Sequence, residues 1–334
     1  MIYKTEIQKP SDKTYRLASK LINNDELVAF PTETVYGLGA NALSDKAVKK
    51  IFIAKGRPQD NPLILHIGKK EDIKKYVKSI NKIQQKLIDV FMPGPISIVF
   101  DKNEKVSDVA CAGGNTVAIR MPENKVARDF INACNCPIVA PSANTSKRPS
   151  PTLAQHVYDD LNGKIPLIID GGETTVGIES TVVKVEDDSV IILRPGKINK
   201  NMIESLTGFK VKDKVVAGKI VESPGMKYTH YKPHCDMIIV KNNMIDNINK
   251  LYDEYVKNNK KPIIFCITAN KNSYSDKNIV CMGKDSTEAS HNLFKLYREF
   301  EYNYDIIIAE YVNNGDMVDA LFNRMSKSAG GKII

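Results

Sequence analysis

The stretch LVAFPTETVYGLGANAL, residues 27–43, decides the fold of the first part of the chain. LVAF (27–30) has the apolar pattern of a short strand, and the polar run PTETVY separates it from Gly37, Gly39 and Ala42. Those three residues match the letters of the G-x-G-x-x-G/A dinucleotide fingerprint, but the fingerprint needs a tight turn directly after the strand. The spacing therefore argues against a nicotinamide or flavin site.

Short apolar strands and amphipathic helices alternate on both sides of this stretch, as in α/β proteins. Gly and Pro interrupt many of the junctions, which favours a mixed, twisted sheet over a regular parallel winding. The patterns predict helices at 11–22, 44–54, 80–91, 124–134 and 152–161, and strands at 27–30, 62–67, 96–100, 116–121, 137–141, 166–170, 180–185 and 190–194.

A length of 334 residues is more than one ordinary domain requires, so we expect two domains. Residues 1–210 form the first, and residues 211–236 carry Gly, Pro and charge without a sustained period, which is typical of a linker. Residues 237–334 show a second alternation that predicts a smaller, doubly wound (Rossmann-like) α/β domain. Its predicted elements are strands at 237–240, 262–267, 278–282 and 305–309 and helices at 244–257, 285–300 and 317–329.

Composition excludes several classes of protein. The chain is 42% hydrophobic and 26% charged, and no apolar run approaches the ~18 residues of a membrane helix. The first residues, MIYKTEIQKPSDK, lack the apolar core of a secretory signal, so we expect a cytoplasmic protein. Six cysteines without a CxxC pair indicate ordinary thiols rather than a disulfide scaffold or a structural zinc site.

The net charge of +9 is unevenly distributed. Residues 237–334 hold 13 Lys and Arg against 12 Asp and Glu, which leaves 35 against 27 for residues 1–236. A basic first part suits a polyanionic partner such as a nucleotide or a nucleic acid. Solvated lysines on helix faces explain the same excess equally well.

Polar clusters follow several predicted strands and helices, where side chains can meet a ligand. PTET (31–34) offers two hydroxyls and a carboxylate, although it also suits a turn with satisfied hydroxyls. Lys55 and Arg57 suit a phosphate chain, with Asn61 and His66 following them, although cations also cap the C-terminal end of a helix.

Three further clusters lie beyond these. Arg120 ends an apolar strand, where burial requires a partner anion such as a ligand carboxylate. The run APSANTSKRPSP (140–151) places hydroxyls and an amide beside Lys147 and Arg148, as an anion-binding loop or an ordinary polar loop does. The run 169–196 contains close-approach glycines, Ser180 at the start of a strand and Arg194 at the end of one.

Several common catalytic motifs are absent: a GxxxxGK[ST] phosphate loop, a GxSxG elbow, an HExxH helix and a kinase signature. His230, His234 and Cys235 lie in the linker without a second ligand pair, so we expect no zinc site. The residues alone predict an anion-binding α/β enzyme for a nucleotide and a small polar substrate.

Several motifs in one order over residues 5–234 closely resemble the Sua5 type of the Sua5/YrdC family. They are PTETVYGLG (31–39), KGRP (55–58), SAN (142–144), GIESTVV (177–183), LRPG (193–196) and SPGMKYTHYKPH (223–234). The resemblance implies a YrdC-like mixed twisted sheet and a nucleotidyltransferase that condenses L-threonine, bicarbonate or CO2, and ATP to threonylcarbamoyl-AMP and pyrophosphate. Residues 237–334 suit the smaller C-terminal domain of the Sua5 type.

The resemblance also implies roles for individual residues. Lys55 and Arg57 belong to the catalytic KxR…SxN signature. The positions that match ATP-binding residues are Arg57, Asn61, Thr116, Ser142, Asn144, Ser150, Arg194 and Tyr231. The positions that match threonine-binding residues are Thr34, His66, Arg120, the backbone at Ala140, and Ser180. Mg2+ is expected with ATP, and no prosthetic group or resident metal is expected.

The family further implies that a separate transferase uses the product to form t6A at adenosine 37 of tRNAs that read ANN codons. Direct and indirect contact of this chain with the tRNA or the transferase both stay open. Within the linker, residues 222–234 are expected to form a lid over the pocket. An RNA-binding module is an alternative that fits the basic charge, but the chain lacks an aromatic ladder. A carbamoyltransfer enzyme of the hydrogenase-maturation type is another, but its acylphosphatase and zinc-finger segments are missing here.

Overall fold

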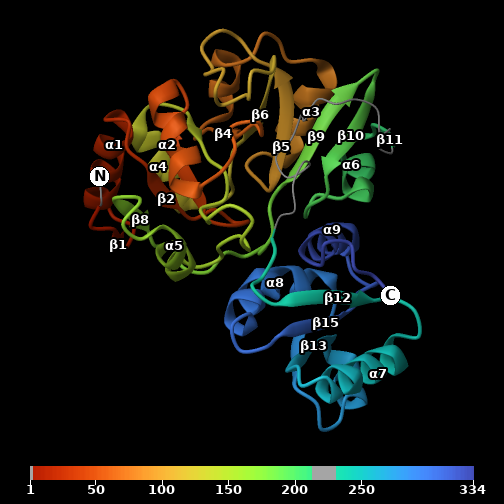
Figure 1. Ribbon diagram of the computed structural model, residues 1–334. Coiled ribbons are helices and arrows are strands. Elements are labelled where there is room, and N and C mark those ends of the chain that lie inside the picture. The colour runs from red at the N-terminus through yellow and green to blue at the C-terminus, as the bar shows by residue number, and fades with distance from the viewer. Residues whose placement is uncertain (1–2, 213–230) are drawn as a thin grey trace. The chain divides into compact units, whose positions relative to one another are not determined.

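The computed structural model describes residues 3–212 and 231–334, which divide into two compact units (Figure 1). The first unit contains residues 3–146, 150–175 and 179–212. The second contains residues 231–334 together with two short segments from earlier in the chain, 147–149 and 176–178. The predicted linker, 211–236, lies mostly outside the described residues, so its boundaries stay a prediction.

Within residues 3–212, eleven strands form one mixed sheet in the order β1-β8-β2-β3-β7-β4-β6-β5-β9-β10-β11. Neighbours are parallel in pairs such as β4 with β6 and antiparallel in pairs such as β2 with β3. The strands are β1 (Glu6–Gln8), β2 (Val28–Phe30), β3 (Gly37–Asn41), β4 (Ile64–His66), β5 (Ile96–Asp101), β6 (Thr116–Arg120), β7 (Ile138–Val139), β8 (Leu167–Ile169), β9 (Thr181–Glu186), β10 (Ser189–Arg194) and β11 (Val211–Lys212).

Several helices of this unit begin where the sequence offers a side-chain cap. Ser11, Ser44 and Asn124 each accept a hydrogen bond from a backbone N–H of the first turn. The helices are α1 (Asp12–Asn23), α2 (Asp45–Lys55), η1 (Lys70–Lys75), α3 (Lys82–Phe91), α4 (Lys125–Cys134), α5 (Ala154–Leu161) and α6 (Lys200–Thr207).

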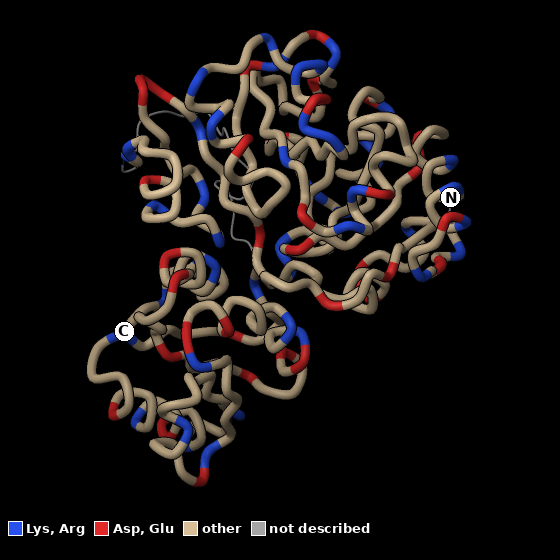
Figure 2. The backbone as a smooth tube through the Cα atoms, turned by 180° about the vertical axis from the view of Figure 1, so that it is seen from behind, with Lys and Arg blue, Asp and Glu red and all other residues tan. Residues whose placement is uncertain are grey.

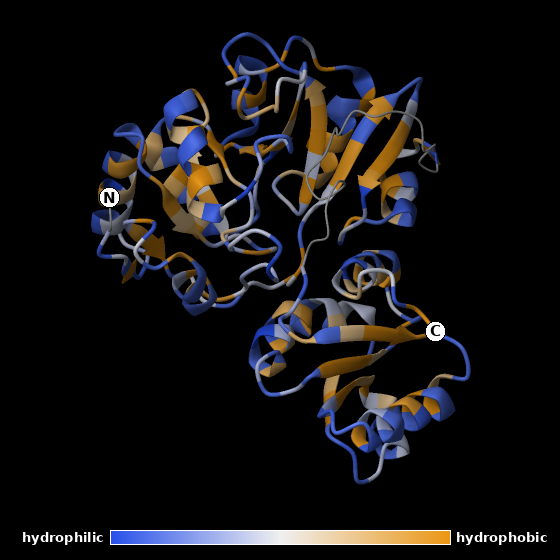
Figure 3. Ribbon diagram, viewed as in Figure 1, coloured by the Kyte–Doolittle hydropathy of each residue, from blue (hydrophilic) through white to orange (hydrophobic). Residues whose placement is uncertain are grey.

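Alternation along the strands separates two apolar layers. The larger one covers one face of the sheet and includes Ala29, Leu38, Leu65 and Ile119. On the other face, α1 and α4 pack over Val28, Phe30 and Ile138. Figure 3 shows the strands as the most apolar segments of the unit, with polar loops between them. The mixed α/β architecture predicted from the sequence is confirmed.

The second unit is built on four parallel strands in the order β12-β15-β13-β14. An apolar cluster under α7 includes Ile248, Ile264 and Ile308. The elements of this unit are β12 (Asp236–Val240), α7 (Met244–Lys257), β13 (Pro262–Ile267), η2 (Thr268–Ser273), β14 (Ile279–Gly283), α8 (Ser286–Phe300), β15 (Ile306–Glu310) and α9 (Val318–Ser328). Parallel strands joined by helices confirm the predicted Rossmann-like domain.

All predicted helices and strands occur within two residues of their expected ends, but β3 was missed. The sequence placed Gly37–Asn41 in a polar loop, whereas it forms a buried strand between β2 and β7. Glycine is depleted in strands, so propensity gave no signal. It is required here, because a Cβ at Gly39 would lie 2.9 Å from Cγ2 of Ile138 and 3.1 Å from the carbonyl oxygen of Val28.

Candidate active site

Four polar residues lie on the face of the first sheet opposite Leu65 and Ile119 of the larger apolar layer, beside a small apolar cluster. The cluster consists of Ile64, Val99, Ala118 and Val182. Side chains two residues apart on a strand share a face, and β4 pairs with β6 so that His66 lies opposite Arg120. The polar residues placed by this period of two are Ser97, His66, Arg120 and Ser180, and all four are buried.

Arg120 forms a buried ion pair with Glu33. Its Nη2 atom donates to Oε1 of Glu33 at 2.7 Å, and both side chains are 5% exposed. Glu33 also accepts hydrogen bonds from the backbone N–H groups of Glu123 and Asn124, before α4. The partner anion that the sequence required for a buried Arg120 is thus present in the protein as Glu33, and a ligand carboxylate at Arg120 stays a prediction. The Nε atom of Arg120 is buried and has no partner among the described residues.

Thr34 lies in the same loop as Glu33. Its hydroxyl is 2.8 Å from that of Thr32, and the Thr32 oxygen accepts the backbone N–H of Thr34. Nη2 of Arg120 lies 3.4 Å from the Thr32 hydroxyl. The loop after β2 therefore brings hydroxyls and a carboxylate to the guanidinium, and bonds from PTET to a ligand stay a prediction.

His66 is held as a neutral imidazole. Burial, and secondly the nearby Arg120 guanidinium, lower its pKa to about 3. Its Nδ1 lies 3.0 Å from the carbonyl oxygen of Ile64, which places the ring proton on Nδ1. The ring stands edge-on to Phe30, with 6.0 Å between centroids. A neutral ring beside Arg120 suits substrate binding and leaves little basicity for proton abstraction.

Lys55 joins the two halves of the KxR…SxN signature. Its Nζ donates to the carbonyl oxygens of Ser142 and Asn144, and the side chain is 2% exposed. The backbone carbonyl of Lys55 also accepts the N–H of Ser146. Lys55 therefore binds backbone groups of the loop after β7 and holds that loop in place. The sequence had left open that Lys55 only caps the end of a helix.

Arg57 and Asn61 form a second small group. Nη2 of Arg57 donates to the Asn61 carbonyl oxygen at 3.2 Å. The Asn61 side chain is 1% exposed, and neither of its amide atoms has a partner within the described part of the chain. Leaving a buried polar group unbonded costs about 1–3 kcal/mol, so an amide in this state is suited to a ligand.

Ser180 and Arg194 contact each other directly. Arg194 donates from Nε to the Ser180 carbonyl oxygen at 3.0 Å and from Nη2 to the Ser180 hydroxyl at 3.1 Å. Ser97, which the sequence analysis did not identify, lies 2.9 Å from the same hydroxyl. Ser180, which is predicted to bind threonine, and Arg194, which is predicted to bind ATP, therefore share one hydrogen-bond network.

The other predicted residues are dispersed. Ser150 is buried and donates to Oε1 of Glu179, which was also missed. Thr116 begins β6 and is half-buried, while the N–H of Ala140 is bonded to the carbonyl of Ile64. Tyr231 belongs to the second unit, where its ring stacks on Phe294 at 5.3 Å between centroids.

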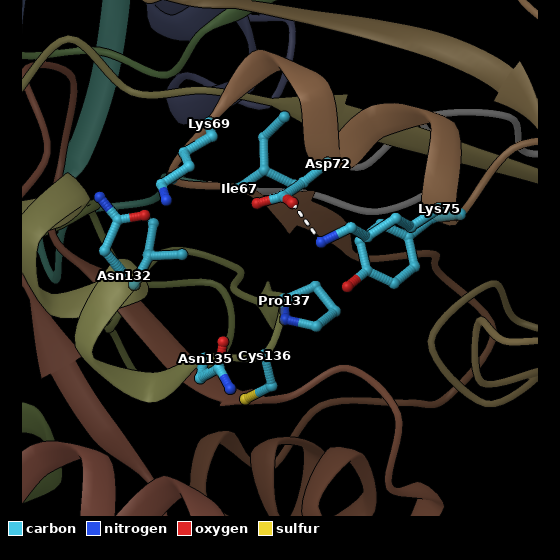
Figure 4. A pocket seen from close by; sticks show the side chains of 11 residues that line it. Ile67, Lys69, Asp72, Lys75, Asn132, Asn135, Cys136 and Pro137 are labelled. Carbon is cyan, nitrogen blue, oxygen red and sulfur yellow. Dashed lines mark ion pairs between the residues drawn. The ribbon is translucent and has the colours of Figure 1, made fainter.

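A hollow of about 140 Å³ lies beyond the end of β4. Figure 4 shows Lys69, Asp72, Lys75 and Asn132 around it, with the Asp72–Lys75 ion pair spanning 2.7 Å. None of the predicted substrate residues lines it. We therefore place the candidate site at the polar face described above rather than at this hollow.

The described residues contain neither a cluster of metal-binding side chains nor a helix suited to a membrane. No group of three His, Cys, Asp or Glu side chains there could hold a metal ion. None of the helices in that part of the chain is long and apolar enough to cross a membrane. Figure 2 shows Lys and Arg interspersed with Asp and Glu in both units, and pairs such as Lys50–Glu26 account for some of the surface lysines.

Family models match both units of the chain. The Sua5/YciO/YrdC model, described as "Telomere recombination", matches residues 20–196. A second model, "Threonylcarbamoyl-AMP synthase, C-terminal domain", matches residues 198–330. The chain belongs to the Sua5 family. The resemblance drawn from the short motifs is thereby confirmed over almost the whole sequence.

Full-length relatives agree with this assignment. The threonylcarbamoyl-AMP synthase of Pyrococcus abyssi is 42% identical over 96% of this chain and 95% of its own length. The enzyme of that name from Bacillus subtilis is 39% identical over 99% of this chain and 97% of its own. The crystal structure of P. abyssi Sua5 complexed with L-threonine is 38% identical, covers 100% of this chain and 99% of its own, and has a TM-score of 0.90. This Sua5 protein is therefore similar to enzymes along its full length.

Proposed function

We propose that this Sua5 protein is an L-threonylcarbamoyladenylate synthase that condenses L-threonine, bicarbonate or CO2, and ATP, with release of pyrophosphate. The names of full-length relatives and the threonine bound to P. abyssi Sua5 support this proposal. The observation that carries it in this chain is a pair of buried, unbonded polar groups. They are the side-chain amide of Asn61 and the Nε–H of Arg120, neither of which has a hydrogen-bond partner among the described residues.

Such groups favour a polar ligand over an apolar one. Each costs roughly 1–3 kcal/mol when it is left without a partner, and a bound ligand that bonds both recovers that free energy. Asn61 follows the KxR motif, and Arg120 lies beside Thr32 and opposite the neutral His66. We assign Asn61 and Arg57 to the nucleotide and Arg120 to the carboxylate of threonine.

The chemistry requires no covalent enzyme intermediate. The threonine amine adds to CO2 and loses a proton, which gives an N-carboxylate. One oxygen of that carboxylate attacks the α-phosphorus of ATP, and the bond to the departing pyrophosphate breaks. Positioning two anionic reactants and stabilising the phosphate charge would supply the catalysis, with Arg57 and Arg194 as candidates for stabilising that charge.

Mg2+ fits this set of side chains as a companion of ATP. Mg2+ commonly takes phosphate oxygens and water as ligands, and it would neutralise the charge of the triphosphate. The carboxylates closest to the proposed site, Glu33 and Glu179, already accept hydrogen bonds from Arg120 and Ser150. We therefore propose that the ion is held by the nucleotide rather than by a dedicated set of protein ligands.

The remaining sequence-based expectations extend the same proposal. The lid at 222–234 falls mainly on residues outside the described part of the chain, and Tyr231 is described only in its position within the second unit. Delivery of the product to a transferase that forms t6A at adenosine 37 remains a prediction, as does the cytoplasmic location.

Pyrophosphate release tests the proposal. The purified protein is incubated with ATP and Mg2+, and threonine and bicarbonate are omitted in turn while the adenylate product is followed by mass spectrometry. Release should require both co-substrates and should fall in Asn61→Ala and Arg57→Ala, but not in Lys46→Ala, whose exposed side chain pairs only with Asp25 among the ion pairs described. Release that continues without threonine would reject the synthase assignment.

A further inference from the structure

The second unit includes two segments that lead directly into a buried hydrogen bond of the first. Segment 147–149 precedes Ser150, and segment 176–178 precedes Glu179. The Ser150 hydroxyl donates to Oε1 of Glu179 at 2.5 Å, and the two residues are 0% and 7% exposed. Whatever fixes these two segments therefore also fixes, through the covalent chain, a serine that we assign to the nucleotide.

Glu301 is the anchor of the first segment. It follows α8 directly, and its side chain is only 1% exposed (Figure 1). Arg148 donates to it in bidentate fashion, from Nη1 to Oε2 at 2.7 Å and from Nη2 to Oε1 at 2.5 Å. The same carboxylate accepts the backbone N–H of His234 at 2.9 Å. A planar, doubly bonded pair of this kind fixes orientation as well as distance.

Backbone contacts reinforce this anchor. Arg298 donates from Nη2 to the Pro149 carbonyl oxygen at 2.6 Å, and the N–H of Lys232 bonds to the carbonyl of Lys147 at 2.9 Å. Three successive residues of the segment are thus held, either by side chain or by backbone. The sequence left open whether Arg148 belongs to an anion-binding loop or to an ordinary polar loop, and in the structure Arg148 pairs with the carboxylate of Glu301.

The second segment, 176–178, is held by close packing of its backbone against the backbone of α8. Gly177 has φ = +83°, and a Cβ atom there would lie 2.4 Å from the carbonyl oxygen of His291 and 2.5 Å from that of Ser290. Backbone therefore packs against backbone, with no room for a side chain. The segments that precede Ser150 and Glu179 are therefore both fixed by residues of α8 or by Glu301 at its C-terminal end.

We propose that Glu301 and Arg148 are positioning residues for the nucleotide-binding loop that contains Ser150. In this proposal, the second unit holds segments 147–149 and 176–178 in place, so that Ser150 and Glu179 keep their positions. The inference rests on the proposed function for the assignment of Ser150 to ATP. It gives the C-terminal domain a role in the affinity for ATP that is separate from any lid. Misplacing a binding group by about 1 Å can cost up to ~100-fold in rate, so displacement of the loop has a measurable effect.

The test compares Glu301→Gln, Arg148→Met and the double variant in the full-length protein. The matched control is Glu310→Gln, which alters another fully buried carboxylate of the second unit whose described partners are Ile267, Asn270 and Tyr274. We expect KM for ATP to rise about tenfold or more in both single variants, with no further rise in the double variant, because coupled residues are not additive. KM for threonine should change less than twofold.

Hydrogen exchange and direct nucleotide binding separate this inference from the proposed function. Amides in 144–152 and 174–180 should exchange at least tenfold faster in Glu301→Gln and in Gly177→Ala, but not in Glu310→Gln, whether or not the protein makes pyrophosphate. Unchanged exchange in a folded Glu301→Gln, or an equal effect of Glu310→Gln, would overturn the inference. Faster exchange with unaltered affinity for a non-hydrolysable ATP analogue would also overturn it.

Discussion

His66 should make the stability of this protein depend on pH between about 3 and 6.5. Its pKa is lowered from 6.5 to about 3, first by burial and then by the Arg120 guanidinium. The unfolded chain therefore binds a proton at this residue below pH 6.5, whereas the folded chain does not until about pH 3. Protons then favour the unfolded state, so the free energy of unfolding falls as the pH is lowered through this range.

The expected magnitude follows from the linkage relation. One pH unit within the range changes the free energy of unfolding by about 1.4 kcal/mol per group. Lowering the pH from 6.5 to 5 should therefore destabilise the protein through His66 by roughly 2 kcal/mol. Most carboxylates titrate below pH 5, so they contribute less to the slope in this interval.

Urea unfolding at several pH values between 5 and 7.5 measures this slope. His66→Asn keeps a donor for the Ile64 carbonyl, and His66→Phe keeps a ring against Phe30. Both variants lack a titrating group, so their curves should be flatter than that of the unaltered protein by roughly 2 kcal/mol at pH 5, whatever their absolute stability. Parallel curves for all three proteins would show that His66 is not buried as a neutral ring.

Three other predictions concern packing and the loops of the site. Glu33→Gln leaves Arg120 without its buried anion and should lower the free energy of unfolding by about 3 kcal/mol in urea titrations; a loss below about 1 kcal/mol would contradict the pairing. Lys55→Met removes both bonds to the loop after β7 and should lower kcat/KM for ATP at least ~tenfold in the pyrophosphate assay, and an unaltered value would exclude a positioning role. Gly39→Ala brings a methyl group against Ile138 and should cost about 1–3 kcal/mol by thermal unfolding, whereas a neutral effect would mean that the strand can shift.

Much of the fold could be predicted because hydrophobic period and capping residues agree along the chain. The missed elements are those in which the local signal is weak or was not used. β1 and β11, with the sequences EIQ and VK, are short strands that each have at most one apolar residue, so no apolar run marks them. α6 did have a signal, since Asn199 caps its start and Gly208 ends it in the left-handed conformation.

The sequence indicated candidate residues for the site, whose binding roles stay predictions, but it did not indicate how these residues pair with one another. Hydroxyls, cations and amides after strands could be recognised as a set, and the family motifs gave them roles. The residues that hold this set, Glu33, Ser97 and Glu179, are common residue types, and their roles depend on which strands become neighbours. Ser97 meets Ser180 because β5 pairs with β9, a contact between residues 83 positions apart in the sequence.

These pairings change what the cations of the site are expected to do. Lys55, Arg120 and Arg194 each already bind a carbonyl, a carboxylate or a hydroxyl of the protein, so part of their charge maintains the shape of the loops. A cation that serves both structure and substrate cannot be removed without affecting both, because its former partner is left buried and unbonded. Loss of activity in an alanine variant of such a residue therefore does not identify a direct phosphate contact. Variants that preserve the protein bond, such as Lys55→Arg, are the ones whose kinetics can separate the two roles.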